Sequence, residues 1–190
     1  MDYQEIGRFE LNEAEAKKWA IDGMILLLVS LPVFLLFPMF FGKGVKWVFR
    51  WHTIPLNIVL TAFLFLLHEL IHGLTINLFG AKAHYTYGIK ADLPYLATTT
   101  ESYLSLNQYK VVALTPFLLI SLAGVALIVH YPQTKLLFAV PLAIHTSGAV
   151  GDLHIVKLLR RYPKESLVKD DLTGFRIYLR SAPGGNTQTF

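Results

Sequence analysis

The chain has 190 residues, the length of one domain, and 54% of them are hydrophobic whereas only 16% are charged. Soluble domains average about 25% charged residues, so this composition excludes an ordinary water-soluble protein. The net charge is +4, and nearly all Lys and Arg residues lie outside the long apolar runs, which favours a lipid bilayer as partner and no nucleic acid. There is no cysteine, which excludes disulfides, thiolate metal sites and cysteine nucleophiles.

Residues 1–19 are predicted to form a polar N-terminal segment, with a short helix around residues 11–20 (LNEAEAKKWA). Residues 24–41 then form an uncharged run of 18 residues, which is long enough for a membrane-spanning helix. Pro32 and Pro38 should kink or end that helix.

Three more apolar runs follow, at residues 53–79, 111–129 and about 136–158. The residues between the second and third runs alternate aromatic, β-branched and polar side chains, which predicts a β-hairpin or β-loop at 83–100. A further strand is predicted at residues 174–180 (GFRIYLR). We therefore expect a mainly α fold, an integral membrane bundle of about four transmembrane helices with a small β-hairpin or β-loop between spans two and three.

The transmembrane domain is expected at residues 20–160, followed by a basic cytoplasmic tail at 161–190 whose end is disordered. With four spans, thirteen of the 17 Lys and Arg residues lie on the side that holds both termini and the hairpin, and four lie on the other side. Because cytoplasmic loops are enriched in Lys and Arg, both termini are predicted to be cytoplasmic.

The second apolar run contains residues 68–72, HELIH, which follow the pattern H-E-x-x-H. Positions i and i+4 share one face of a helix, so His68 and His72 can present two imidazoles to a single metal ion. Glu69 lies beside that ion, where it can accept a proton from a water that the metal activates. Zinc suits this ligand set, one ion per chain. The alternative is a buried polar cluster in which the three side chains satisfy one another.

A catalytic zinc site requires a third protein ligand. The metzincin pattern would place a histidine six residues after His72, but that residue is Leu78. We favour Asp152 in the fourth run, because a lone carboxylate at membrane depth needs a partner. The alternative is a helix-end carboxylate that pairs with Lys157 or Arg160.

His145 competes with Asp152, because it lies seven residues earlier and therefore on the same helical face. It is a candidate auxiliary or alternative ligand, or an oxyanion stabiliser; the alternative is a histidine bonded to a backbone carbonyl. Other polar residues are weaker candidates: His154 and His84 for the metal, His52 and His130 as solvated histidines, Asp92 and Glu101 as loop carboxylates, and Asn57 and Asn77 for bonds between helices.

Several motifs together resemble the "putative zincin peptidase" family of bacterial multi-span membrane proteins. They are HELIHGL, LFGAK, QYKVVALTPF, the Gly-Asp pair at 151–152 and DDLTGFRIY, which together extend through most of residues 60–180. The layout is more distantly similar to site-2 intramembrane zinc proteases, although the Asn-Pro…Asp-Gly context of their aspartate is replaced here by Gly-Asp. The resemblance implies a peptidase in the bacterial cell membrane, with His68 and His72 as ligands, Glu69 as general base and Asp152 as third ligand.

The sequence thus predicts a membrane-embedded zinc metalloprotease that hydrolyses peptide bonds in a peptide or membrane-protein substrate. The zinc would activate a water, and Glu69 would act as the general base. The alternative is a non-catalytic zinc-binding or scaffold protein of the membrane, in which the metal is held by four protein ligands and Glu69 is dispensable.

Overall fold

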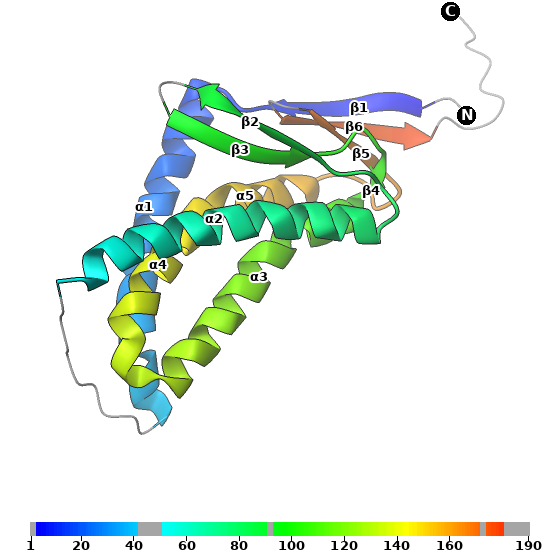
Figure 1. Ribbon diagram of the computed structural model, residues 1–190. Helices are drawn as coiled ribbons and strands as arrows, with labels where there is room; N and C mark the ends of the chain where they lie inside the picture. Colours follow the sequence, from blue (N-terminus) through cyan, green and yellow to red (C-terminus); the bar gives the residue numbers. More distant parts are fainter. Residues whose placement is uncertain (1–2, 42–50, 91–92, 172–173, 181–190) are drawn as a thin grey trace, which may run out of the picture.

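Long apolar helices make up most of the fold, and the strands gather at one end of these helices (Figure 1). The structure, a computed structural model, describes residues 3–41, 51–90, 93–171 and 174–180. By length and composition, four helical segments could cross a membrane: Glu13–Phe41, Thr53–Leu78, Leu106–His130 and Pro132–Leu159. The predictions of a mainly helical fold with about four such segments and of a small β-hairpin between the second and third are therefore confirmed, whereas the four-stranded sheet was not predicted.

The first two apolar runs form the helices α1 (Glu13–Leu36) and α2 (Thr53–Leu78). Asn12 caps α1 by accepting a hydrogen bond from the backbone N–H of Glu15, so the short helix expected around residues 11–20 is the first part of α1. After α1 the chain continues as the 3₁₀ helix η1 (Phe37–Phe41), which contains Pro38. The bounds of α2 agree with the run predicted at 53–79.

The third run forms α3 (Leu106–His130), which begins five residues earlier than predicted. A capping box explains the early start, because the Ser105 side chain accepts from the Gln108 N–H while the Gln108 side chain accepts from the Ser105 N–H. The 3₁₀ helix η2 (Pro132–Thr134) then connects α3 to the fourth run.

The fourth run is broken, which corrects the prediction of one continuous helix at about 136–158. It forms α4 (Lys135–Gly148) and α5 (Val150–Leu159), which meet at Ala149 and run in different directions (Figure 1). Gly148 allows the Phe65 ring of α2 to approach closely, since a Cβ at this position would lie 2.6 Å from a Phe65 ring carbon. The hydrogen bond from the Ala149 N–H to the His145 carbonyl, at 2.9 Å, closes the last turn of α4.

Two small antiparallel sheets complete the fold. The four-stranded sheet has the order β1-β6-β5-β4, formed by β1 (Tyr3–Glu10), β6 (Gly174–Arg180), β5 (Leu167–Asp171) and β4 (Leu104–Ser105). The second sheet is the hairpin of β2 (His84–Lys90) and β3 (Leu93–Thr99). The hairpin and the strand at 174–180 were predicted, whereas β1 lies in the segment expected to be only polar. Residues 181–190, whose disorder was predicted, lie outside the described part.

Two clusters of buried apolar residues hold these elements together. One cluster lies between the helices α1, α3 and α4 and includes Phe34, Ile120 and Leu142. The other joins the four-stranded sheet to the adjoining ends of α2, α3 and α5 and includes Tyr109 and Phe175. Only 6% of the apolar window of α2 is buried inside the molecule, so its outer surface is almost entirely hydrocarbon exposed to the surroundings. In Figure 1, α2 crosses the direction of α1 steeply, and the hairpin lies alongside it.

Candidate metal centre

The two histidines of HELIH converge on one point beside α2. Both residues are buried, and the Nε2 atoms of His68 and His72 lie 3.0 Å apart. This convergence follows from helical geometry, because residues four apart lie one above the other on the same face. The structure thus brings these two predicted ligands together.

Hydrogen bonds to the opposite ring nitrogens orient both imidazoles. The Nδ1 atom of His72 lies 2.9 Å from the backbone carbonyl oxygen of Val112 on α3. A carbonyl can only accept, so Nδ1 of His72 carries the proton and Nε2 presents a lone pair to the site. The Nδ1 atom of His68 lies 3.0 Å from Nε2 of His145 on α4. The structure therefore places His145 behind His68, on the side away from His72.

Asp152 reaches the same point from the first turn of α5. Its carboxylate oxygens lie 3.0 Å from Nε2 of His68 and 3.6 Å from Nε2 of His72. Asp152 therefore lies against the two histidines. The break at Ala149 makes this approach possible, because it turns α5 away from the direction of α4.

These three residues form a donor set that fits zinc. Bonds of about 2.0–2.1 Å in a tetrahedron would separate two ligand atoms by about 3.3 Å, and the three observed separations lie close to that value. Two imidazole lone pairs and a carboxylate facing one another inside the protein are unfavourable unless a cation or a proton lies between them. The residues present therefore suit a zinc ion held by His68, His72 and Asp152.

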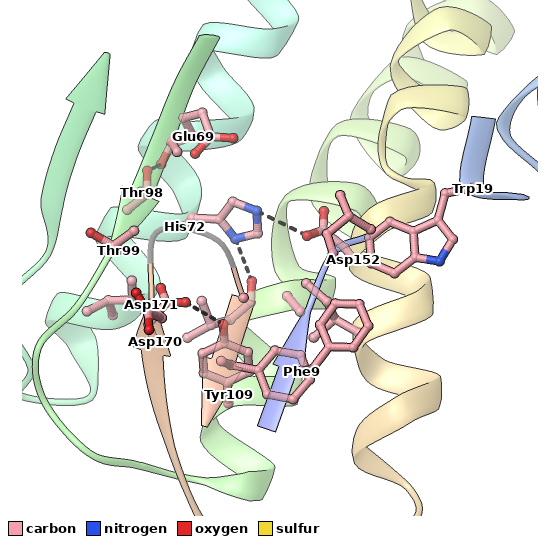
Figure 2. A pocket seen from close by; sticks show the side chains of 18 residues that line it. Phe9, Trp19, Glu69, His72, Thr98, Thr99, Tyr109, Asp152, Asp170 and Asp171 are labelled. Carbon is pink, nitrogen blue, oxygen red and sulfur yellow. Dashed lines mark hydrogen bonds and ion pairs between the residues drawn. The ribbon is translucent and has the colours of Figure 1, made fainter. Parts of the chain in front are cut away.

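Glu69 lies next to this set. One donor atom from each of His68, Glu69 and His72 can be chosen such that all three lie within 4.8 Å of one another. Figure 2 shows the His72 ring pointing toward Asp152, with Glu69 on the other side of the ring. The Glu69 carboxylate can therefore contact a water or substrate bound at this point from the side opposite Asp152.

The hairpin is fastened to the turn of α2 that carries these residues. The Thr98 hydroxyl of β3 donates to the Glu69 carbonyl at 2.9 Å. Gly73 lets the Tyr85 hydroxyl of β2 lie against α2, in the space that a Cβ at this position would occupy. These two contacts place the end of β3 directly beside Glu69 (Figure 2).

A cavity of about 340 Å³ opens in front of Glu69, His72 and Asp152. Its opposite wall is aromatic: Phe9 of β1 stacks on Trp19 of α1 and on Phe175 of β6, with ring centroids 5.6 and 5.3 Å apart. The cavity is thus enclosed by strands, helices and the hairpin together, and it is large enough for side chains of a bound peptide.

The cavity also contains a carboxyl group that sequence reasoning did not select. Asp170 on β5 accepts a hydrogen bond of 2.9 Å from the Tyr109 hydroxyl. Burial raises the pKa of the Asp170 carboxyl to about 6, an effect that the hydrogen bond from Tyr109 partly opposes. Asp170 lies within the quoted motif DDLTGFRIY, which was the available signal. No sequence signal could have identified the Val112 carbonyl as the partner of His72, because every residue has a backbone carbonyl.

The remaining candidates lie away from this centre. His154 stacks on Trp19 and pairs with Asp22 at 2.9 Å. Asn77 does not join helices but accepts from the Ala83 N–H at 3.1 Å. The others lie at helix ends, in strands or in connecting segments: His52 precedes α2, His130 ends α3, His84 begins β2, and Glu101 follows β3. Asn57 lies within α2, and Asp92 lies outside the described residues.

Comparison with known proteins identifies one family. A family model described as "Putative zincin peptidase" matches residues 61–167, more than half of the chain. The match includes HELIH, His145 and Asp152 but ends before β6. No curated protein and no solved structure matches the chain.

The metal centre predicts the zinc content of purified variants. We expect about one zinc per chain in wild-type protein purified in detergent without chelators, measured by inductively coupled plasma mass spectrometry. His72→Ala and Asp152→Ala should each reduce the zinc content to below about a tenth, because only two protein ligands would remain. The matched control is His130→Ala at the exposed end of α3, which should retain zinc. Unchanged zinc content in Asp152→Ala would exclude this residue as a ligand.

The cavity predicts a pH-dependent effect of Asp170→Asn on stability. Its folded-state pKa of about 6 exceeds the unfolded value of 3.8, so the stability this carboxyl contributes is full at low pH and is lost as pH rises through 6. Two pKa units correspond to about 3 kcal/mol, reduced by partial solvation. The melting temperature of Asp170→Asn relative to wild type should therefore increase between about pH 4 and pH 6.5 and stay level above that range. Melting temperatures that change in parallel with pH for the two proteins would contradict the raised pKa.

Proposed function

The chain belongs to the family described as putative zincin peptidases, and from this premise we propose that it is a membrane-embedded zinc metalloprotease. One observation carries the proposal. His68 and His72 of α2 and Asp152 of α5 meet within 3.0–3.6 Å of one another, with Glu69 beside them at a cavity. Three protein ligands with an adjacent free carboxylate are typical of catalytic zinc sites, whereas structural sites have four protein ligands.

The residues of this site divide the work of peptide hydrolysis. A bound zinc ion supplies Lewis-acid chemistry, which makes a water more acidic and polarises a carbonyl group. His68, His72 and Asp152 would hold that ion. Glu69 accepts the proton of the attacking water and later delivers it to the leaving amine. Its backbone carbonyl accepts a hydrogen bond from Thr98, which fixes the helical turn from which the carboxylate extends.

The substrate that suits this cavity is an extended peptide with apolar side chains. Thr98 and Thr99 of β3 line the cavity beside Glu69, and among the described strands β3 pairs only with β2. The other edge of β3 could therefore form backbone hydrogen bonds with a substrate strand. The aromatic wall of Phe9, Trp19 and Phe175 would receive apolar side chains, as a membrane protein supplies in abundance.

We place the active site toward the cytoplasmic face of the membrane. The described strands gather at one end of the apolar helices (Figure 1), and their residues Phe9, Asp170 and Phe175 line the cavity in front of the metal centre. That end carries most of the Lys and Arg residues, which are enriched on the cytoplasmic side of bacterial membrane proteins.

The proposed activity is tested with Glu69→Gln. This change preserves the shape of the side chain and removes the base, so it should reduce peptide cleavage about 10²–10⁴-fold while zinc remains bound. The zinc-loaded protein in detergent is incubated with a proteome-derived peptide library, and new termini are identified by mass spectrometry.

The control for this experiment is Glu101→Gln, the same substitution at an exposed glutamate outside the cavity, which should cleave at the wild-type rate. Equal cleavage by Glu69→Gln and wild type would contradict the assigned role of Glu69. A wild-type protein that holds zinc and cleaves no peptide would instead support the non-catalytic scaffold.

The proposed orientation is tested by labelling single cysteines, which is direct because the chain has none of its own. Glu101 precedes α3 and Gln133 follows it, and both are exposed. In intact cells a membrane-impermeant maleimide should label Gln133→Cys, and it should label Glu101→Cys only after permeabilisation. The reverse pattern would invert the topology, and labelling of both in intact cells would contradict a membrane-crossing α3.

A further inference from the structure

We propose that His145 is a positioning residue of the metal centre, which holds His68 in the one arrangement that leaves its Nε2 free for the metal. This inference rests on the proposed function, since it concerns the same site. It assigns His145 a place behind a ligand rather than in the coordination sphere.

The contacts of His145 lead to this assignment. Its side chain is fully buried, and its Nε2 lies 3.0 Å from Nδ1 of His68, the nitrogen that faces away from His72 and Asp152. The two rings meet edge to face, with centroids 5.1 Å apart and an interplanar angle of 63°. The other nitrogen of His145, Nδ1, is buried without a hydrogen-bond partner among the described residues. His68 is thus the hydrogen-bond partner that the structure shows for this imidazole.

A neutral imidazole has one nitrogen that donates and one that accepts, so the pair can exist in two arrangements. In the first, Nδ1–H of His68 donates to His145, and Nε2 of His68 presents its lone pair beside His72 and Asp152. In the second, His145 donates to His68, and the proton on Nε2 of His68 points at Asp152 and closes the site. Metal binding requires the first arrangement.

The two proposed zinc ligands His68 and His72 therefore differ in how strongly their partners fix the position of the ring proton. The carbonyl of Val112 can only accept, so it holds His72 in the metal-ready state at all times. His145 can accept or donate, so it stabilises the metal-ready state of His68 when an ion is present and allows the closed state when it is absent. A partner of this kind adjusts metal affinity without touching the ion.

The break in the fourth apolar run gives His145 this position. His145 lies in the last turn of α4, where its carbonyl accepts from the Ala149 N–H, and Asp152 lies in the first turn of α5. His68 is consequently contacted at Nδ1 from one helix and at Nε2 from the other. The Phe65 ring packs against His145, with ring centroids 6.3 Å apart.

The test measures zinc affinity by competition with a chromophoric chelator, using detergent-purified full-length protein. His145→Gln places an amide oxygen where Nε2 stands and can accept from His68, whereas the shorter Asn cannot reach it. His145→Asn should weaken zinc binding about 10–100-fold, and His145→Gln should restore affinity to within about threefold of wild type. The matched control is Thr146→Val, the next residue on α4, which is buried and whose hydroxyl has no hydrogen-bond partner among the described residues; this variant should bind zinc as wild type does.

A second readout reports the proton itself. In zinc-loaded protein with ¹⁵N-labelled histidine, the Nδ1 atom of His68 should carry a proton that gives a correlation to Nε2 of His145. This readout compares the two amide variants with wild type under conditions where all three are saturated with zinc. His145→Asn should shift the Nδ1–H signal of His68, and His145→Gln should return it toward the wild-type position.

The outcomes are distinguishable. Equal zinc affinity of His145→Asn, His145→Gln and wild type overturns the positioning role and leaves the metal centre intact. Zinc bound through Nδ1 of His68 or directly by His145 overturns it as well. A wild-type protein that binds no zinc overturns the proposed function and this inference together.

Discussion

The convergence of His68, His72 and Asp152 on one buried point is the constraint around which this protein is organised. Three electron-rich groups face one point inside an apolar molecule, and each is prevented from turning away. The Val112 carbonyl orients one ring, His145 the other, and α5 delivers the carboxylate. A buried arrangement of this kind requires a proton or a cation at the shared point, so zinc binding at the proposed centre would have to displace a proton.

The helices and strands can be understood as supports for that point. In the proposed metal centre, α2 would supply two ligands and the general base, α3 supplies the carbonyl that bonds His72, and α4 and α5 bring His145 and Asp152 to His68. β1 and β6 pair across almost the whole length of the sequence, from Tyr3↔Arg180 to Glu10↔Gly174, and bring the aromatic residues Phe9 and Phe175 to the cavity. The first and last strands of the fold thereby line a cavity whose polar residues Glu69, His72 and Asp152 belong to α2 and α5.

Several of these features could be predicted from the sequence, and others could not. The largely apolar run at residues 53–79 predicted the bounds of α2, and helical spacing alone predicted that His68 and His72 converge. The break at Ala149 has no proline beside it, and the close approach of the Phe65 ring to Gly148 involves another helix that no local pattern could show. β1 escaped notice because it is a polar edge strand whose alternation is shifted by an irregularity between Glu5 and Gly7. Its partner lies far away in sequence, so no local pattern could show the pairing.

The fastening of the hairpin to α2 has a consequence for selectivity. Thr98 is bonded to the carbonyl of Glu69, and Tyr85 lies against Gly73, so two contacts hold the hairpin against the turn of α2 that carries Glu69 and His72. A peptide strand paired with β3 would have its backbone held in a fixed register relative to the metal. Under the proposed function, the bond that is cut would be determined by how many residues separate it from the segment paired with β3, more than by the side chains on either side of it.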